Sequence, residues 1–285
     1  MSIEKLVLGT VQFGLNYGIA NKNGKPDAAL VEDILLRAWE LGIRTLDTAA
    51  AYGDSEDVLG RTLEKLGLNG KMKIVTKLLP APGYRSRDLQ ALITNSLMRL
   101  REKTLHAILF HHETEAENLP VLKCAAAEMN IRCGISLDSS DIPGVEYADL
   151  IQVPCNVFDR RFLALIRKCH AAGIEVHCRS IYLQGVLLMP EKEIPAFLAP
   201  LIPYRRQMES LAAEAGIAPA ELYMRYLISI PEADGFLTGV DTVEQLEYNA
   251  AIAARGPLEP ALFERITEII PVFPENLIRP SLWRK

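Results

Sequence analysis

The sequence lacks the cysteine patterns of disulfide scaffolds and zinc knuckles. Its five cysteines form an odd number and none belongs to a CxxC pair; they are Cys124, Cys133, Cys155, Cys169 and Cys178. Neither a disulfide framework nor a zinc knuckle is therefore indicated. Most of these cysteines lie in or beside apolar segments, where we expect them to fill the core. Unpaired thiols favour a reducing compartment, so we expect a cytoplasmic location.

Long apolar runs and basic tracts are missing as well. No run of about 18 apolar residues occurs, so we expect no membrane span, and the first five residues contain no signal-peptide core. The 285 residues carry a net charge of −5 without a basic tract, which argues against nucleic acid as a partner. Hydrophobic residues make up 49% and charged residues 24%, which is typical of a globular protein with a sizeable core.

The GxGxxG fingerprint of Rossmann folds is also absent. Apolar segments with strand character instead alternate with segments of helical periodicity along the chain. Strands are expected at 6–10, 43–47, 74–77, 105–111, 131–136, 150–153, 174–180 and 235–240. Helices are expected at about 27–41, 119–129, 158–172, 204–215, 219–230 and 260–269, with further apolar helical faces at 58–66 and 89–100 and a helix that begins near 242. Strict alternation implies a parallel sheet. Eight units favour a single-domain (β/α)8 TIM barrel over residues 1–285, with extra C-terminal helices; a doubly wound open sheet is the alternative.

Titratable side chains stand at the ends of three successive predicted strands. Asp47 ends one strand and is followed by Tyr52 in a loop of small residues, while Lys77 and His111 end the next two strands. Each residue alone has an ordinary structural explanation, such as an N-capping Asp or a half-buried loop Tyr. At the carboxyl ends of neighbouring parallel strands, however, such side chains converge. We therefore expect one site that contains all four.

These residue types suit the reduction of a carbonyl group. A phenol can protonate the nascent alkoxide if its pKa, about 10 when unperturbed, is lowered toward working pH. A neighbouring ammonium stabilises the phenolate and so lowers that pKa, and a carboxylate keeps the ammonium charged and in place. Tyr52, Lys77 and Asp47 fit these three roles.

The pattern resembles the catalytic tetrad of the aldo-keto reductases. The residues that carry the resemblance are Leu46-Asp47-Thr48-Ala49 with Tyr52-Gly53, then Lys77 and His111, and it extends from Leu8-Gly9-Thr10 to Glu244-Gln245-Leu246 with Asn249. It covers most of the chain. It implies that Tyr52 is the general acid, that Lys77 and Asp47 tune it, and that His111 orients the carbonyl group.

Adjacent histidines leave a choice at the third strand end. His111 and His112 would point to opposite sides of an extended strand, and the family pattern places His111 at the catalytic position and His112 on the rim. A metal site made of His111, His112 and Glu113 is the weaker interpretation, because adjacent residues rarely bind one ion; no metal is expected. The remaining histidines, His106, His170 and His177, show no partner spacing and are expected to be structural or exposed.

A hydride donor has to come from a cofactor, because no side chain supplies one. The resemblance implies NADPH or NADH, bound over the barrel mouth. The contacts that it implies are Gly9, Thr10, Asp47, Ser136, Gln152, Arg179, Ser180, Gln184, Gly239, Gln245 and Asn249. The sequence departs from the family pattern at Leu137, Ile181 and Tyr182. Arg179 could stack on the nicotinamide, pair with a phosphate or form an ordinary salt bridge.

The segment after the last strand predicts a weakened preference for NADPH. Relatives that prefer NADP often carry a Lys and an Arg here for the 2′-phosphate, whereas this chain has Gly239 and Gln245, and Asp241 adds a negative charge. A helix N-terminus near Thr242 could still hold a phosphate. We therefore expect NADH to be usable.

The sequence indicates the substrate less clearly than the cofactor. Residues expected to line its pocket are Phe13, Tyr17, His112 and Tyr182, and the Gly-, Asn- and Gln-containing edges fit a polar or sugar-like carbonyl compound. Two other functions remain open from the sequence. One is a low-turnover barrel that senses the cofactor or binds a partner, and the other is a Schiff-base lyase that uses Lys77.

Overall fold

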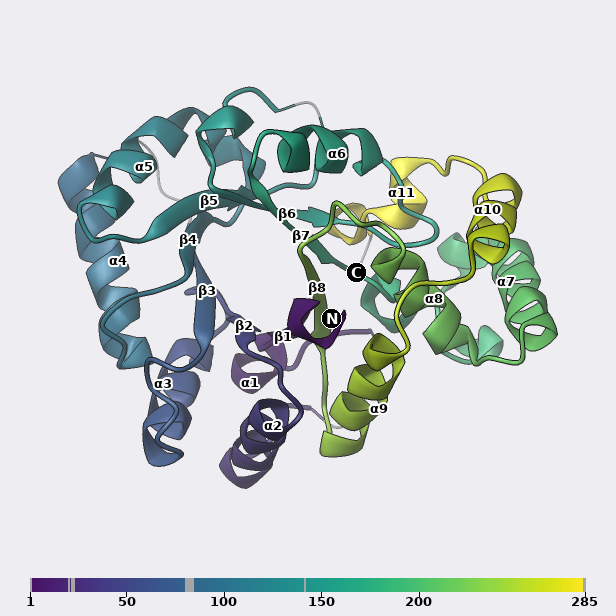
Figure 1. Ribbon diagram of the computed structural model, residues 1–285, viewed down its shortest axis with the longest axis horizontal. Helices are drawn as coiled ribbons and strands as arrows, with labels where there is room; N and C mark the ends of the chain where they lie inside the picture. Colours follow the sequence, from purple (N-terminus) through teal and green to yellow (C-terminus); the bar gives the residue numbers. More distant parts are fainter. Residues whose placement is uncertain (1, 20, 22–23, 80–84, 141, 284–285) are drawn as a thin grey trace.

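Eight parallel strands close into one barrel at the centre of the molecule (Figure 1). The computed structural model describes residues 2–19, 21, 24–79, 85–140 and 142–283. The strands are β1 (Leu6–Gly9), β2 (Thr45–Asp47), β3 (Lys73–Leu78), β4 (Ala107–Phe110), β5 (Arg132–Ser136), β6 (Leu150–Pro154), β7 (Glu175–Arg179) and β8 (Gly235–Gly239). They neighbour one another in chain order, and β8 pairs with β1. The predicted barrel is confirmed, and the open sheet is wrong because this last pairing closes the ring.

Helices surround the barrel and follow the predicted positions closely (Figure 1). They are α1 (Val11–Gly14), α2 (Ala28–Glu40), α3 (Ser55–Lys65), α4 (Ser86–Leu100), α5 (Leu119–Ala127), α6 (Leu163–Ala171), α7 (Ile202–Glu214), α8 (Pro219–Ile228), α9 (Val243–Ala254), α10 (Pro260–Ile269) and α11 (Glu275–Ile278). The one-turn helices α1 and α11 were not predicted, because a single turn is too short to show helical periodicity. In the described part of the chain, no helix is long and apolar enough to span a membrane.

Local sequence signals explain where a typical outer helix begins and ends. The Asp27 side chain caps α2 by accepting a hydrogen bond from the Leu30 N–H at 2.9 Å. The apolar positions Ile34 and Leu35 are fully buried against the barrel. The chain then turns at Gly42, whose φ of +88° is a conformation that glycine adopts without a Cβ clash.

Alternation along the strands divides the apolar residues into two sets. Val75, Ala107, Leu109 and Leu150 form a small cluster inside the barrel. Their strand neighbours, Ile74 and Ile108 among them, belong to the large core between the barrel and the helices. Because side chains alternate, positions 77 and 111 continue the inward-facing series that begins at positions 75 and 107. The residues that end these strands therefore point toward the barrel mouth.

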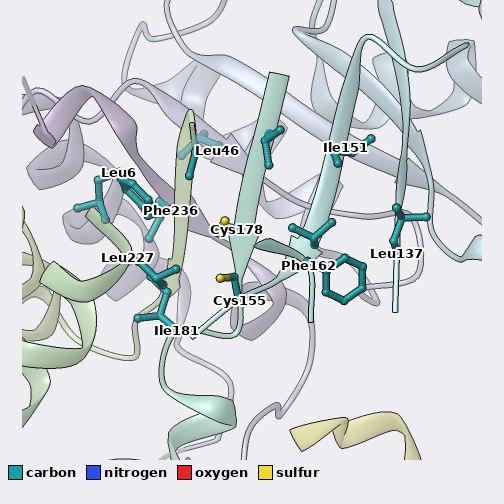
Figure 2. Close-up of a cluster of buried hydrophobic side chains, with 14 of the residues drawn as sticks. Leu6, Leu46, Leu137, Ile151, Cys155, Phe162, Cys178, Ile181, Leu227 and Phe236 are labelled. Atoms are coloured by element: carbon teal, nitrogen blue, oxygen red, sulfur yellow. The ribbon is translucent and has the colours of Figure 1, made fainter. Parts of the chain in front are cut away.

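The outer core also accounts for most of the cysteines. Figure 2 shows part of it, with Cys155 and Cys178 among leucine, isoleucine and phenylalanine side chains. Cys133, Cys155, Cys169 and Cys178 are buried and Cys124 is exposed, and all five are free thiols. The prediction that most cysteines fill the core is confirmed.

A polar cluster occupies the opposite end of the barrel from the mouth. Glu175, the first residue of β7, lies 2.7 Å from His177 Nε2 and 3.1 Å from His106 Nε2, and it also pairs with Arg132. His177 is 2% exposed. Burial opposes the charge of Glu175, but hydrogen bonds from the two histidines lower the pKa of this carboxyl well below its ordinary range. His106 and His177 are structural, as expected, although the sequence spacing showed no partner for them.

This cluster predicts a pH-dependent contribution to stability. The folded-state pKa of Glu175 is lowered, so its stabilisation is fully present above the unfolded pKa of about 4.3 and is lost as the pH falls below it. We expect Glu175→Gln to lower the free energy of unfolding by about 2 kcal/mol at pH 7, because the buried His177 and the half-buried His106 lose their carboxylate. Urea unfolding at pH 7 and pH 4 measures this. The matched control is Glu146→Gln at an exposed position; equal stability of the two variants at pH 7 would contradict the prediction.

Candidate active site

A buried ion pair lies at the centre of the barrel mouth. Lys77 is 1% exposed, and its Nζ lies 2.6 Å from Asp47 Oδ1 and 2.9 Å from the Thr48 carbonyl oxygen. The other Asp47 oxygen accepts a hydrogen bond from Gln152 Nε2 at 2.7 Å. Burial disfavours the ammonium, but Asp47 and then Tyr52 outweigh it and raise the pKa of Lys77 above its ordinary value. The lysine is therefore charged across the neutral pH range.

Two rings lie directly beside this ion pair. Lys77 Nζ is 5.1 Å from the centroid of the Tyr52 ring. The Tyr52 ring meets the His111 ring edge to face, with centroids 5.5 Å apart and planes at 79°. The structure thus brings together Asp47, Tyr52, Lys77 and His111, four residues that the sequence distributes over three strand ends and a loop.

Close backbone packing fixes the turn that carries Tyr52. Gly53 has a φ of +57°, and a Cβ at this position would lie 2.5 Å from the Gly14 carbonyl oxygen. A Cβ at Gly14 would lie 1.7 Å from the Tyr52 carbonyl oxygen. Only glycine allows α1 and this turn to approach so closely. The buried Ser55 adds a hydrogen bond of 2.9 Å from its hydroxyl to the Thr10 carbonyl oxygen.

His111 is a neutral imidazole at physiological pH. Burial, followed by the positive charges of Lys77 and Arg179, lowers its pKa to about 3. A neutral ring has one N–H donor and one acceptor nitrogen. The neighbouring His112 is 45% exposed, and its Nδ1 accepts a hydrogen bond from the Thr114 N–H. Across the described ranges, no group of three or more His, Cys, Asp or Glu residues is suited to hold a metal ion.

Polar side chains next to the tetrad suit the amide of a nicotinamide. Ser136, the last residue of β5, is the register partner of Gln152 in the middle of β6, and both are almost fully buried. Because Gln152 Nε2 already donates to Asp47, its oxygen is left to accept an amide N–H. Arg179 ends β7 and keeps a buried Nε without a hydrogen-bond partner. This donor and acceptor set fits a nicotinamide cofactor.

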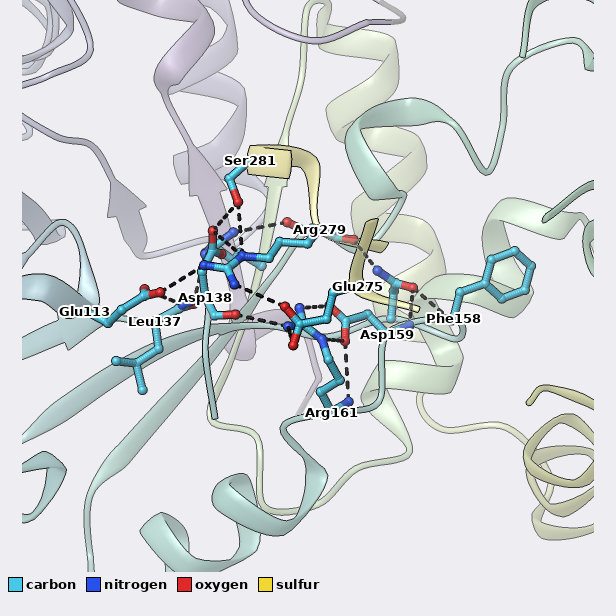
Figure 3. A network of polar contacts seen from close by, with 12 residues as sticks. Glu113, Leu137, Asp138, Phe158, Asp159, Arg161, Glu275, Arg279 and Ser281 are labelled. Atoms are coloured by element: carbon cyan, nitrogen blue, oxygen red, sulfur yellow. Dashed lines mark hydrogen bonds and ion pairs between the residues drawn. The ribbon is translucent and has the colours of Figure 1, made fainter. Parts of the chain in front are cut away.

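Arg179 forms an ion pair, which is one of the three roles that the sequence left open for this side chain. Its Nη2 donates to Asp138 Oδ1 at 2.5 Å and to the Leu137 carbonyl oxygen at 3.0 Å. Asp138 in turn accepts from Ser281 Oγ at 2.9 Å and lies 3.6 Å from Arg279 Nε (Figure 3). The sequence missed Asp138 and Arg279, because no local signal pairs residues so far apart.

The same network attaches the C-terminal segment to the barrel mouth. Arg279 also donates to Glu113 Oε1 at 3.0 Å, and Glu113 Oε2 accepts from the Asp138 N–H at 2.8 Å (Figure 3). Burial opposes the charge of Asp138, but Arg179 and Arg279 lower its pKa below the ordinary value. The carboxylates of Glu113 and Asp138 therefore join the segments after β4 and β5 to the end of β7 and to the C-terminal segment.

The predicted adenosine-end residues lie at the end of β8 and along α9. Gly239 pairs with Gly9 across β8 and β1, and Asn249 accepts a hydrogen bond from the Tyr182 hydroxyl at 3.4 Å. The Gln245 side chain accepts from the Asp241 N–H at 2.7 Å. The Ser180 and Gln184 backbones, in the loop after β7, have positive φ angles of +65° and +53°.

Two predicted contact residues are fully buried. Phe13, expected to line the substrate pocket, is fully buried in the outer core. Thr10, expected to contact the cofactor, is also fully buried, and its hydroxyl donates to the Asp47 carbonyl oxygen at 3.0 Å. The short helix α1 follows β1 directly and carries Phe13; the two contacts stay predictions. Tyr17 and Tyr182 remain partly exposed near the mouth.

Comparisons with known proteins agree with this geometry. The family model described as "Aldo/keto reductase family" matches residues 5–271. The aldo-keto reductase AKR11C1 of Bacillus halodurans, solved in its holo form, superposes with a TM-score of 0.76 at 20% identity, covering 96% of this chain and 95% of that one. The glycerol dehydrogenase AKR11B4 of Gluconobacter oxydans gives 0.73 at 21% identity, covering 97% and 92%.

A putative aldo-keto reductase of Pseudomonas aeruginosa gives a TM-score of 0.66 at 21% identity, covering 88% of this chain and 89% of that one. At such identities, the three structures show a shared fold. A search of curated proteins found no match. The family model, in contrast, spans nearly the whole sequence, and on that ground the chain belongs to the aldo/keto reductase family of NAD(P)-dependent oxidoreductases.

Proposed function

We propose that this enzyme reduces an aldehyde or ketone to an alcohol, with Tyr52 as the general acid. The observation that carries the proposal is the position of the Tyr52 ring between the Lys77 ammonium and the His111 ring. A buried ammonium stabilises the phenolate that remains after the phenol has given up its proton. Asp47 keeps that ammonium charged, since it raises the pKa of Lys77 despite complete burial.

The proton-transfer step follows from these charges. Tyr52 donates its hydroxyl proton to the carbonyl oxygen as negative charge develops there, and Lys77 stabilises the resulting phenolate. His111 is neutral, so a ring N–H can orient the carbonyl oxygen without competing as an acid. The nicotinamide, when bound, supplies the hydride. Ser136 and Gln152 would hold its amide, and Arg179 has a spare donor at the same side of the mouth.

The state of Lys77 argues against a Schiff-base lyase. A lysine that attacks a carbonyl group must be a free amine, which active sites obtain by lowering its pKa. Here Asp47 and Tyr52 raise the pKa of Lys77, and its Nζ is engaged with Asp47 and the Thr48 carbonyl oxygen. A barrel that only senses the cofactor would not require this arrangement.

The proposed acid role predicts a specific defect in Tyr52→Phe. Loss of the hydroxyl removes the proton donor but keeps the ring, so kcat for carbonyl reduction should fall about 100- to 10,000-fold. Absorbance at the nicotinamide band measures turnover, and quenching of protein fluorescence measures cofactor binding, which should persist. Tyr147→Phe, at a tyrosine that is 45% exposed on the outside of the barrel, is the matched control. Retained activity in Tyr52→Phe would assign the acid role to another group.

A second proposal concerns the choice of cofactor. The Asp241 carboxylate lies beside the start of α9 and accepts a hydrogen bond from Asn21 Nδ2 at 3.2 Å. A carboxylate at the adenosine end repels the 2′-phosphate of NADPH but suits the ribose hydroxyls of NADH. We propose that NADH is a usable cofactor for this enzyme.

Comparing kcat/KM for the two cofactors tests this proposal. Asp241→Asn should shift the NADPH-to-NADH ratio of kcat/KM about tenfold toward NADPH, because the variant removes one repelling charge. Asp33→Asn, at an exposed position on α2, is the charge-matched control and should leave the ratio unchanged. A wild-type preference for NADPH of roughly 1,000-fold, on the order of 4 kcal/mol, would overturn the proposal.

A further inference from the structure

A chain of three buried hydroxyl groups lies behind the turn that carries Tyr52. Thr10, Thr48 and Ser55 are all fully buried, and Ser55 Oγ lies 3.0 Å from the Oγ1 atom of each threonine. Ser55 donates its proton to Thr10, whose carbonyl oxygen lies 2.9 Å away, and Thr10 Oγ1 donates to the Asp47 carbonyl oxygen at 3.0 Å. Each hydroxyl has one proton and a carbonyl oxygen only accepts, so Thr48 is the donor in its contact with Ser55.

Ser55, in the middle of this chain, connects the turn that carries Tyr52 to the surroundings of Lys77. The Ser55 backbone N–H donates to the Tyr52 carbonyl oxygen at 3.0 Å. The Ser55 hydroxyl accepts from Thr48, whose own carbonyl oxygen accepts a hydrogen bond from Lys77 Nζ at 2.9 Å. The candidate acid and the ammonium are therefore attached to backbone segments that one serine joins.

The contact between Ser55 and Thr48 closes a loop that contains Tyr52. The two residues are seven positions apart, and Tyr52 lies between them. Opening this loop would leave buried hydroxyl groups without partners, which is costly. The helix α1 packs against the same point, since a Cβ at Gly14 would lie 2.7 Å from the Ser55 nitrogen. The hydrogen bond thus limits the movement of Tyr52 relative to Lys77.

The distance between Tyr52 and Lys77 matters for proton transfer. Lys77 Nζ lies 5.1 Å from the centroid of the Tyr52 ring. The attraction between an ammonium and a phenolate falls as their separation increases, and a displacement of about 1 Å at a reacting group can cost about 100-fold in rate. Ser55 is fully buried, so it acts on this step through its neighbours.

We propose that Ser55 is a positioning residue for the proton transfer from Tyr52. Its hydroxyl joins Thr48 to the turn and so sets the distance between the Tyr52 phenol and the Lys77 ammonium. This inference rests on the proposed reduction with Tyr52 as the general acid. It adds to that role a requirement for a hydroxyl at position 55, which the binding of substrate and cofactor does not share.

Replacing Ser55 with alanine tests the inference. With the fastest substrate among propanal, benzaldehyde and glycolaldehyde and with saturating cofactor, Ser55→Ala should lower kcat about 10- to 100-fold and leave KM unchanged. The alkaline limb of the pH profile of kcat should move to higher pH, because the phenolate is held less closely to the ammonium. The cofactor Kd, measured by quenching of protein fluorescence, should not change. An unchanged kcat and pH profile, or a loss that appears in KM and Kd instead, would overturn the inference.

A second variant breaks the same chain at its other member. Thr48→Val keeps the branched side chain but removes the proton that Ser55 accepts, so it should show the same loss of kcat as Ser55→Ala. The double variant should lose no more than either single variant, because both substitutions interrupt one chain. Losses that multiply in the double variant would contradict the inference.

Ser96→Ala is the matched control. Ser96, on α4, is also fully buried, and its hydroxyl has no hydrogen-bond partner within the described part of the chain. The substitution removes the same atom from the core without breaking a hydrogen bond, so kcat and its pH profile should equal those of the wild type. A similar loss in this variant would attribute the effect of Ser55→Ala to a core defect and overturn the inference.

The role of Ser55 can fail separately from the proposed function. An inactive Tyr52→Phe variant beside a fully active Ser55→Ala variant would overturn the role of Ser55 alone. Retained activity in Tyr52→Phe, or a wild-type enzyme that binds the cofactor but reduces none of the three aldehydes, would overturn both. Thermal unfolding shows whether the variants fold, and if neither Ser55→Ala nor Thr48→Val does, the chain serves stability and the inference is wrong.

Discussion

The ion pair between Lys77 and Asp47 is the constraint on which the barrel mouth depends. Removing both charges from water is costly, and the attraction between them offsets that cost only if the remaining hydrogen-bonding groups are satisfied. Here the Thr48 carbonyl oxygen and Gln152 Nε2 complete the set. Three strands are therefore held in register by one charge pair, and Tyr52 is placed against it. Two apolar side chains would fill the same space at less cost, so the proposed role beside Tyr52 explains this buried pair better than stability does.

Polar groups occupy both ends of the barrel, and an apolar layer separates them. At one end, Glu175 pairs with two histidines and Arg132; at the other lie Lys77 and its partners. The middle layer contains Val75, Ala107, Leu109 and Leu150. Strand β7 runs from one polar end to the other, with Glu175 at its first position and Arg179 at its last. The apolar layer separates the charged groups of the two ends, so the pKa values at each end depend on the neighbouring groups at that end.

The barrel fold and the clustering of the four tetrad residues could be predicted from the sequence because both follow from short-range patterns. Strand ends and alternation place Lys77 and His111 on the inward side, and the structure has them there beside Tyr52. The short helix α1 after β1 was not predicted, because a single turn of helix has no periodicity to detect. The contact between Asp138 and Arg279 was also not predicted, since an ion pair between distant residues produces no pattern in either local segment.

These missed contacts explain how loops that differ from the family pattern can still form a defined mouth. Leu137 and Tyr182 stand where the resemblance implies other residues. Asp138, directly after Leu137, supplies a rigid alternative: it fixes Arg179 on one side and is fixed by Arg279 and Ser281 on the other. Arg279 and Ser281 thus stabilise a barrel mouth whose four candidate catalytic residues all lie in the first half of the sequence. The contacts that position the mouth come from both halves of the sequence, whereas the candidate catalytic residues lie between residues 47 and 111.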